Sequence, residues 1–216
     1  MRERTRDMKE LTKEIRSLIN SEVGDTVQTR VQEFIQLHHK GNDFWFSELC
    51  FCILTANSSA ILGIKIQRQV NPDGFKTLSL EQLTNKLAKL GHRFPNRRAE
   101  FIVNARTFSE IKEIITGFAD SRNARDWLVK NVKGLGLKEA SHFLRNVGYF
   151  DLAILDRHIQ SVMLEYGMVT MLPKSMTKRN YLAMEEKLRT LSEELTLPIG
   201  VLDLYLWYMK TGKVLK

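Results

Sequence analysis

The sequence predicts an all-α protein of about eleven helices, and two observations support this prediction. Apolar residues recur every three or four positions along almost the whole chain, which is typical of helices with one buried face. No segment shows the apolar and polar alternation of a confident strand. The clearest apolar series lie in three stretches: Met8, Leu11, Ile15 and Leu18; Val27, Val31, Phe34 and Ile35; and Leu80, Leu83, Leu87 and Leu90.

Helix-starting and helix-ending residues divide these series into separate elements. Ser79 and Gln82 have the spacing of a capping box, and Pro95 and Pro198 suit the first turns of later helices. Glycines that suit helix ends follow several of the series: Gly91, Gly148, Gly167 and Gly212.

Three further segments depart from this regular pattern. Residues 42–70 are the most hydrophobic stretch, so they are expected to form the central buried helices. Residues 70–75, with the sequence Val-Asn-Pro-Asp-Gly-Phe, predict a turn. Residues 169–174 predict a second irregular connection.

Length and charge limit the possible architectures and partners. A chain of 216 residues can bury one substantial core, or form two lobes that meet in a cleft. The formal net charge of +8 suits a polyanionic partner, because each basic contact with a phosphate releases condensed counterions. Charge alone fits a basic protein with solvated side chains equally well.

The cysteines and the ends of the chain indicate a compartment. Cys50 and Cys52 lie in an apolar run, where a helix would turn their side chains about 200° apart. They are therefore expected to be core residues in a reducing compartment rather than a disulfide. No apolar run approaches transmembrane length, and the first seven residues are charged rather than signal-like. We expect a soluble intracellular protein, cytoplasmic or associated with the nucleoid, with no membrane partner.

The segment from Lys133 to Asp156 combines a glycine turn, a lysine and a later carboxylate. Gly134 and Gly136 allow a tight turn with positive φ and close approach of the backbone to another molecule. An amphipathic helix follows until Gly148. A helix N-terminus beside a glycine turn binds phosphate well, so this segment is suited to contact with a phosphate group.

This pattern resembles the helix-hairpin-helix DNA glycosylases, the superfamily that includes endonuclease III. Within it, the chain is most similar to the archaeal-type 8-oxoguanine DNA glycosylases, which are also AP lyases. The matching segments cover most of the chain: 52–57, 91–101, the hairpin, 154–158, and 206–212 with the final Lys216. Many non-enzymatic DNA binders share the glycine hairpin, whereas Lys138 combined with Asp156 and the matching C-terminal end is much more specific.

The resemblance implies a two-lobed helix-hairpin-helix glycosylase fold with a cleft between the lobes. Residues 1–216 would form a single glycosylase unit, with a hairpin-containing lobe at roughly 45–150 and a second lobe made from both termini. The implied partner is double-stranded DNA containing 8-oxoguanine, bound by a monomer. No metal or organic cofactor is implied, since two cysteines cannot form the four-cysteine iron-sulfur site of endonuclease III-like enzymes. A monovalent cation held by hairpin carbonyls is compatible with the resemblance.

Lys138 and Asp156 are the candidate catalytic residues. A glycosylase that is also a lyase needs an uncharged amine to attack C1′ of the sugar, and the first turn of a helix should favour the uncharged form of Lys138. Asp156 would stabilise the oxocarbenium-like charge and relay a proton. The alternative for Lys138 is a surface lysine that touches phosphate. Asp156 precedes another amphipathic helix, so its ordinary role would be a helix N-cap, and this role can coexist with catalysis.

The resemblance also implies which residues recognise the damaged base after it leaves the duplex. Phe94 and Trp207 would sandwich 8-oxoguanine, and Lys216 would join them in the base pocket. For the two aromatic residues the alternative is core packing, and for Lys216 it is a frayed end. Asp203, one turn before Trp207, either faces solvent or accepts hydrogen bonds from the base edge.

The remaining candidates are DNA-binding residues. The turn at Gly134 and Gly136 would contact phosphate. Four basic residues are candidates for further phosphate contacts, against the alternative of solvated charges: Arg97, Arg98, Lys133 and Arg157. Asn57 is expected on a buried helix, where its amide would be structural or would contact the strand opposite the lesion. His142 and His158 follow the two catalytic candidates closely, and we assign neither a chemical role.

Three other functions remain open from the sequence. A monofunctional adenine-mismatch glycosylase would belong to the same superfamily, but such enzymes usually lack a lysine at the hairpin position and carry the iron-sulfur cluster. An endonuclease III-like glycosylase for another oxidised base would share the lysine and aspartate, but it would be expected to carry the cluster. A non-catalytic helix-hairpin-helix DNA-binding module would explain the charge and the glycines, but it would have no reason to pair Lys138 with Asp156.

Overall fold

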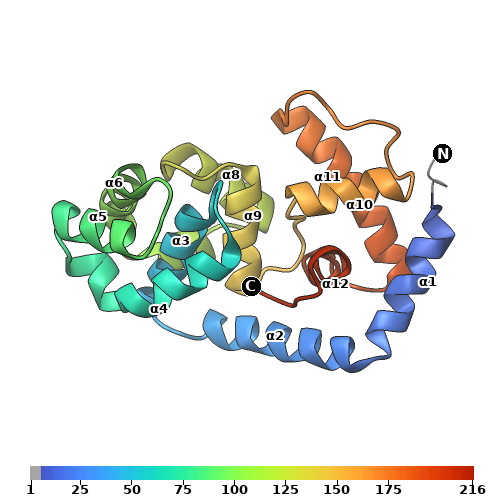
Figure 1. Ribbon diagram of the computed structural model, residues 1–216, viewed down its shortest axis with the longest axis horizontal. Coiled ribbons are helices and arrows are strands. Elements are labelled where there is room, and N and C mark those ends of the chain that lie inside the picture. The colour runs from blue at the N-terminus through green and yellow to red at the C-terminus, as the bar shows by residue number, and fades with distance from the viewer. Residues whose placement is uncertain (1–5) are drawn as a thin grey trace. The chain divides into compact units, whose positions relative to one another are not determined.

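The computed structural model describes residues 6–216, and this part of the chain is helical, with no strand (Figure 1). The predicted all-α class is confirmed. The described residues form one more α-helix than the sequence pattern predicts, and one short 3-10 helix. The elements are α1 (Met8–Ile19), α2 (Glu22–His38), α3 (Asn42–Thr55), α4 (Ala60–Thr77), α5 (Leu80–Lys89), α6 (Pro95–Ala105), η1 (Arg106–Phe108), α7 (Ile111–Thr116), α8 (Ser121–Asn131), α9 (Leu137–Asn146), α10 (Arg157–Glu165), α11 (Lys178–Leu195) and α12 (Ile199–Thr211).

The chain divides into two compact units. The hairpin unit comprises Phe34–Gly148. The terminal unit comprises the described residues up to Glu33 together with Tyr149–Lys216. Among the described residues, no helix is long and apolar enough to cross a membrane.

The hairpin unit is built around α3. All side chains of this helix from Trp45 to Thr55 are buried, and α3 contacts α4, α6, α7 and α9 (Figure 1). The prediction of a central buried helix is therefore confirmed for α3. Cys50 and Cys52 are free and buried as predicted, and burial raises the pKa of the Cys50 thiol well above its usual value.

The predicted break at residues 70–75 is confirmed at Asn71, where two helices meet at a kink, but the turn is shorter than predicted because only this residue is not helical and α4 continues after it. Asn71 has a φ of 61° and a ψ of 170°, and its side-chain oxygen accepts a hydrogen bond of 2.9 Å from the amide of Gly74. Asparagine tolerates positive φ and caps a helix, and Pro72 suits a first turn. The residue types that predict a turn therefore also restart a helix at once.

A buried polar network fixes α9 to the core of the hairpin unit. The two carboxylate oxygens of Glu48 accept hydrogen bonds from Gln67 at 3.0 Å and from Asn146 at 2.6 Å. Arg145 donates to the side chain of Asn146 at 2.9 Å. Since buried polar groups need partners, these bonds join α3 and α4 to the C-terminal end of α9 and fix the position of that helix.

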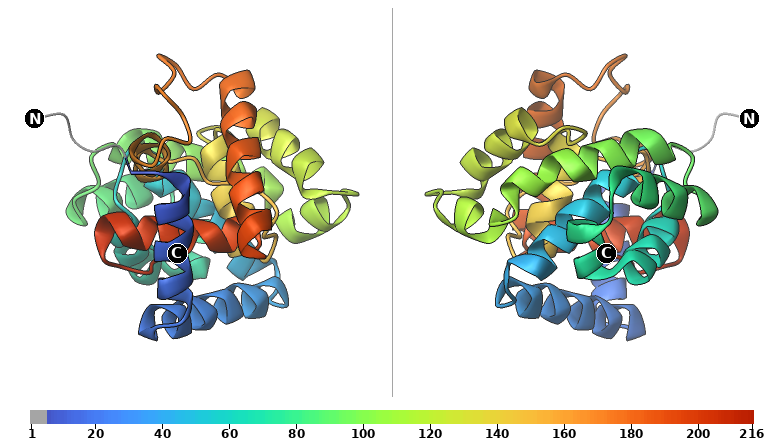
Figure 2. Two further views of the ribbon diagram at one scale, coloured as in Figure 1. Left: turned by 90° about the vertical axis from the view of Figure 1, so that its right-hand side faces the viewer. Right: turned by 90° about the vertical axis from the view of Figure 1, so that its left-hand side faces the viewer.

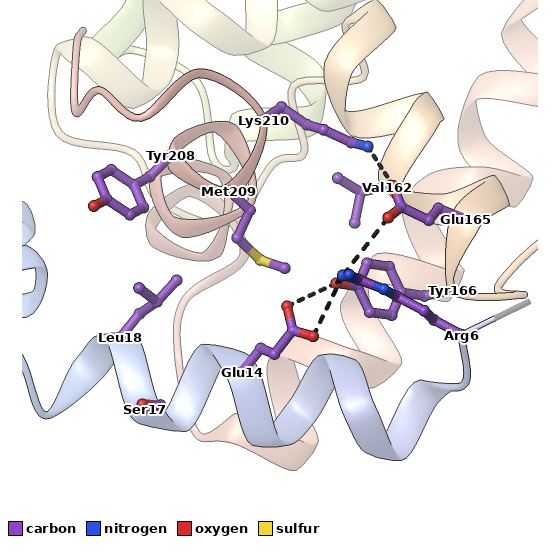
Figure 3. Close-up of a pocket in the computed structure, with 10 residues that line it drawn as sticks. All are labelled: Arg6, Glu14, Ser17, Leu18, Val162, Glu165, Tyr166, Tyr208, Met209 and Lys210. Carbon is purple, nitrogen blue, oxygen red and sulfur yellow. Dashed lines mark hydrogen bonds and ion pairs between the residues drawn. The ribbon is translucent and has the colours of Figure 1, made fainter. Parts of the chain in front are cut away.

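In the terminal unit α12 contacts α1, α10 and α11. Figure 3 shows a pocket of about 330 Å³ at this junction, where charged side chains bridge α1, α10 and α12. Tyr166 accepts a hydrogen bond of 2.6 Å from Arg6 and donates one of 2.7 Å to Glu14, while Glu165 pairs with Lys210. Burial and the bond to Glu14 raise the pKa of Tyr166 to about 12. These contacts anchor the C-terminal end of α10.

A long irregular loop joins α10 to α11, as predicted for residues 169–174. Figure 2 shows it standing out from the helices at its two ends. The four predicted helix ends are also confirmed. Gly91, Gly148, Gly167 and Gly212 have positive φ within two residues of the ends of α5, α9, α10 and α12. Pro95 opens α6 as predicted, whereas Pro198 lies just before the first turn of α12 and acts as its N-cap.

Candidate active site

The glycine hairpin occupies residues 132–136, between α8 and α9. Gly134 has a φ of 92°, and a Cβ at this position would lie 2.4 Å from a ring carbon of Phe101. Both facts require glycine there. The expected positive φ is wrong for Gly136, which has a φ of −98° and is the N-cap of α9. Its amide donates to the Glu139 carboxylate at 3.2 Å, so the second glycine begins the helix rather than bending the chain.

Lys138 is the second residue of α9, as predicted from the hairpin pattern. Its side chain is 25 % exposed, and its Nζ lies 3.7 Å from a carboxylate oxygen of Glu139. The amine is thus accessible from solvent, at the positive end of a helix that the core holds in place. The sequence interpretation missed Glu139, although its spacing of three residues from Gly136 is that of a capping box.

Asp156 is the N-cap of α10, as predicted. One carboxylate oxygen, Oδ1, accepts hydrogen bonds from the amides of His158 at 2.8 Å and Ile159 at 2.9 Å. Among the described residues none donates a hydrogen bond to Oδ2. The cap therefore fixes the carboxylate and leaves one oxygen for another molecule, so capping and catalysis are compatible.

Phe94 lies directly before α6 and does not pack in the core. Its ring is exposed (38 %), and the guanidinium of Arg93 lies 5.1 Å from the ring centroid. His92 orients the backbone here, since its Nδ1 accepts from the Phe94 amide at 3.1 Å and its Nε2 bonds to the Leu54 carbonyl at 2.9 Å. Burial lowers the pKa of His92, which favours the neutral ring that this arrangement needs.

The other base-recognition candidates belong to the terminal unit. Trp207 is partly exposed on α12, and its ring lies 5.9 Å from that of His158 in an edge-to-face arrangement. Asp203 is only 9 % exposed, so the alternative that it faces solvent is wrong. Lys216 is partly exposed.

Three of the four basic candidates are exposed, namely Arg97, Lys133 and Arg157. Arg98 is not, because it is 6 % exposed and donates a hydrogen bond to the carbonyl of Ala56. Burial lowers the pKa of its guanidinium. The phosphate contact of Arg98 stays a prediction that this geometry does not favour, because adjacent residues on a helix point about 100° apart and Arg98 faces inward.

Asn57 also differs from its prediction. It lies exposed in the turn after α3 with a φ of 58°, not on a buried helix. Asparagine is one of the few residues that adopt this conformation readily. Arg98 and His92 bind the carbonyls of Ala56 and Leu54, so these two buried side chains fix the end of α3 and the turn that presents Asn57.

The hairpin unit thus carries a partly buried amine at a helix N-terminus and an exposed aromatic ring. The terminal unit carries a carboxylate that is fixed by a helix cap. A model of the 8-oxoguanine DNA glycosylase family matches residues 27–197. The chain belongs to this family. The match spans the hairpin, Lys138, Asp156 and Phe94.

Individual members of the family support the assignment over nearly the full chain. An 8-oxoguanine DNA glycosylase/AP lyase from Methanocaldococcus jannaschii is 52 % identical over 206 residues, which cover 95 % of this chain and 99 % of that protein. One from Korarchaeum cryptofilum is 47 % identical, with coverage of 96 % and 98 %.

Solved structures of family members agree with the fold. The Methanocaldococcus jannaschii glycosylase/lyase in complex with 15mer DNA containing 8-oxoguanine matches with a TM-score of 0.94 at 51 % identity, covering 96 % of this chain and all of that chain. The 8-oxoguanine DNA glycosylase of Thermotoga maritima matches with a TM-score of 0.91 at 44 % identity, covering 97 % and 100 %.

Proposed function

We propose that this family member excises 8-oxoguanine from double-stranded DNA and then cleaves the strand, with Lys138 as the nucleophile and Asp156 as the assisting carboxylate. The observation that carries the proposal is the placement of Lys138. Its amine stands at the N-terminus of α9, directly after a turn whose backbone geometry requires Gly134. The alternative, a lysine that only touches phosphate, would not form a covalent bond to C1′, so trapping of a covalent adduct separates the two roles.

The reaction begins at C1′ of the damaged nucleotide. The glycosidic bond breaks, its electrons leave with the base, and the lone pair of the Lys138 amine forms a bond to C1′. One proton passes from the attacking amine to Asp156 and from there to O4′ as the C1′–O4′ bond breaks, which opens the sugar and gives a protonated Schiff base. Removal of a proton from C2′ then expels the 3′ phosphate by β-elimination, which cleaves the strand. Water finally hydrolyses the imine and restores the lysine.

Asp156 assists the steps that carry positive charge or move a proton. Its fixed carboxylate stabilises the oxocarbenium-like sugar when the base leaves, and the oxygen that is not used by the cap accepts the proton lost by Lys138. The proposal requires both side chains to reach the same deoxyribose, although they belong to different units of the chain.

Recognition of the damaged base and of the DNA backbone is assigned to other residues. We assign the faces of the expelled base to Phe94 and Trp207, and its polar edge to Asp203 and Lys216. Contacts to the DNA backbone are assigned to the hairpin amides and to the exposed side chains of Arg97, Lys133 and Arg157. Asn57, presented at an exposed turn, is assigned to the strand opposite the lesion.

Borohydride trapping on an 8-oxoguanine duplex tests the proposal. We expect the wild type to form a covalent adduct and Lys138→Gln to form none, while its DNA affinity stays close to wild type because one contact among many is lost. Lys133→Gln is the matched control, since it removes an exposed lysine of the same hairpin and should still form the adduct. An adduct of normal yield with Lys138→Gln would overturn the assignment. Duplexes with other oxidised bases distinguish 8-oxoguanine from the substrates of an endonuclease III-like enzyme.

A further inference from the structure

Asp156 is preceded by a buried segment without regular structure. We call residues 152–156 the linker segment, and its first four side chains are all buried although the segment is neither helix nor strand. Loops normally lie on the surface, because a buried loop leaves backbone amides and carbonyls without water. The polar groups of this backbone must therefore be satisfied by other parts of the protein.

Two buried side chains of α11 supply most of these partners. The carboxylate of Glu185 accepts a hydrogen bond of 2.9 Å from the amide of Ala153. The hydroxyl of Tyr181 donates to the carbonyl of Ala153 at 2.7 Å and accepts from the amide of Leu155 at 3.3 Å. Both side chains are almost completely buried, so these bonds form away from water, and removing one partner would lower the free energy of unfolding.

The remaining bonds connect the linker segment to the N-cap. Gln160, on α10, donates to the carbonyl of Leu155 at 3.1 Å, and the amide of Asp156 donates to the carbonyl of Ile154 at 2.9 Å. The backbone is thus held on both sides of Leu155, one residue before the carboxylate. A shift of this backbone moves Asp156 directly.

We infer that Tyr181 and Glu185 are positioning residues for the reaction, which hold the backbone of residues 153–155 and thereby set the place of the Asp156 carboxylate. The inference rests on the proposed role of Asp156. Neither residue belongs to a motif that identifies the family, and neither touches the reacting atoms. They act on Asp156 only through the backbone of Ala153 and Leu155, to which they are hydrogen-bonded.

The direct test is Tyr181→Phe, which removes the hydroxyl and keeps the ring that fills the core. We expect the single-turnover rate of base excision to fall by roughly tenfold to a hundredfold, the effect of a small misplacement of a catalytic group. The dissociation constant for the 8-oxoguanine duplex should remain at the wild-type value, because Tyr181 is buried. Excision at the wild-type rate in Tyr181→Phe would overturn the inference.

The terminal unit offers a matched control. Tyr205 is also completely buried, but its hydroxyl has no hydrogen-bond partner among the described residues. Tyr205→Phe removes the same atom from the same unit without removing a hydrogen bond, so it should excise at the wild-type rate. A loss as large as that of Tyr181→Phe would show that deletion of any buried hydroxyl impairs the unit, and the inference would fail.

A double-mutant cycle separates positioning of Asp156 from general damage. In the Asp156→Asn background, Tyr181→Phe should cause no further loss, since the group that it positions is already disabled. An undiminished loss in that background would overturn the inference. If Asp156→Asn alone excises at the wild-type rate, the proposed role of Asp156 is overturned instead. The two failures are therefore distinguishable.

Variants of Glu185 provide a second test, which does not require the Tyr181→Phe variant to fold. The amide oxygen of Glu185→Gln can still accept the bond from Ala153, so this variant should excise close to the wild-type rate. Glu185→Ala leaves that amide without its partner and should lose activity at unchanged DNA affinity. Equal excision by both variants, with equal melting temperatures, would contradict the inference.

Discussion

The hairpin and the linker segment each present one of the two proposed reacting side chains, but different interactions hold them. In the hairpin, the backbone conformation of Gly134 and the capping bond at Gly136 fix the start of α9, and the lysine follows two residues later. These determinants lie within five residues of one another. In the linker segment, the residues before Asp156 are apolar and conformationally ordinary, and their position depends on side chains of α11.

This difference predicts that different substitutions disturb the conformations of the two segments. The hairpin should be most sensitive to changes of its own backbone. Outside the hairpin, it should be sensitive only to the groups that touch it or hold α9, namely the Phe101 ring and the buried network around Glu48. The linker segment should be sensitive to changes about 30 residues away in sequence and tolerant of conservative changes within itself. Local geometry suffices for a turn that one glycine can define, whereas a buried irregular segment needs long-range partners.

The largest expected effect belongs to the carboxylate itself. Asp156→Asn should slow base excision by about a hundredfold to ten-thousandfold, the range for a lost general base or charge-stabilising group. Asparagine caps a helix about as well as aspartate, so the melting temperature should change little. Single-turnover excision and thermal unfolding measure the two effects separately. Excision near the wild-type rate would leave Asp156 with only a structural role.

A smaller effect is expected from the backbone of the hairpin. Gly134→Ala should lower the free energy of unfolding by about 1 to 3 kcal/mol for the positive φ alone, and further because its Cβ would meet the Phe101 ring at 2.4 Å. The trapping rate should fall with it, since α9 begins at this turn. Urea unfolding and borohydride trapping measure the two losses.

Two other glycines of the same unit serve as controls. Gly91 has a φ of 88°, but a Cβ added there would meet no heavy atom within 4 Å, so Gly91→Ala isolates the conformational cost from the clash. Gly136 has an ordinary φ, and its Cβ would meet only the end of the Glu139 side chain at 3.3 Å. We expect losses in the order 134, 91, 136. Equal losses at 134 and 136 would contradict the geometry of the hairpin.

The same contrast explains which features the sequence could predict. Helix class, the position of Lys138 and the N-cap role of Asp156 depend on residues within one turn, and all were predictable. The inward direction of Arg98 was not, because Arg97 and Arg98 are equivalent in the local pattern and only packing against the end of α3 separates them. The hydrogen bonds that Tyr181 and Glu185 make to the linker segment could not be predicted from the local sequence pattern either.

Some predictions were inaccurate because the same residue type occurs in two kinds of local structure. Residues 71 and 57 are both asparagines with positive φ, one inside α4 and one after α3. Asparagine permits this conformation without indicating whether a helix ends there or restarts. Local residue types do not decide between the two outcomes, so the turn at 70–75 is shorter than predicted and the buried position of Asn57 was predicted wrongly.

Variants of Lys216 test whether the terminal unit contributes to recognition of the base as well as supplying Asp156. Deletion of Lys216 should reduce excision of 8-oxoguanine more than cleavage at a preformed abasic site, because an abasic substrate has no base for this residue to contact. Lys213→Ala, which removes an exposed lysine of the same segment, is the control and should affect neither reaction. Equal loss on both substrates would remove Lys216 from base recognition.

The smallest expected effect compares two neighbouring arginines of α6. Arg97 is exposed, so Arg97→Gln should flatten the dependence of log affinity on log salt concentration by about one unit, the value for one lost phosphate contact. Arg98→Gln should leave this slope unchanged and lower the melting temperature, since its guanidinium holds the carbonyl of Ala56 inside the hairpin unit. Duplex binding measured at several salt concentrations, with thermal unfolding of both variants, separates the two roles. A changed slope in Arg98→Gln would show that its side chain leaves the core to meet DNA, and an unchanged slope in Arg97→Gln would place that arginine away from the DNA-binding face.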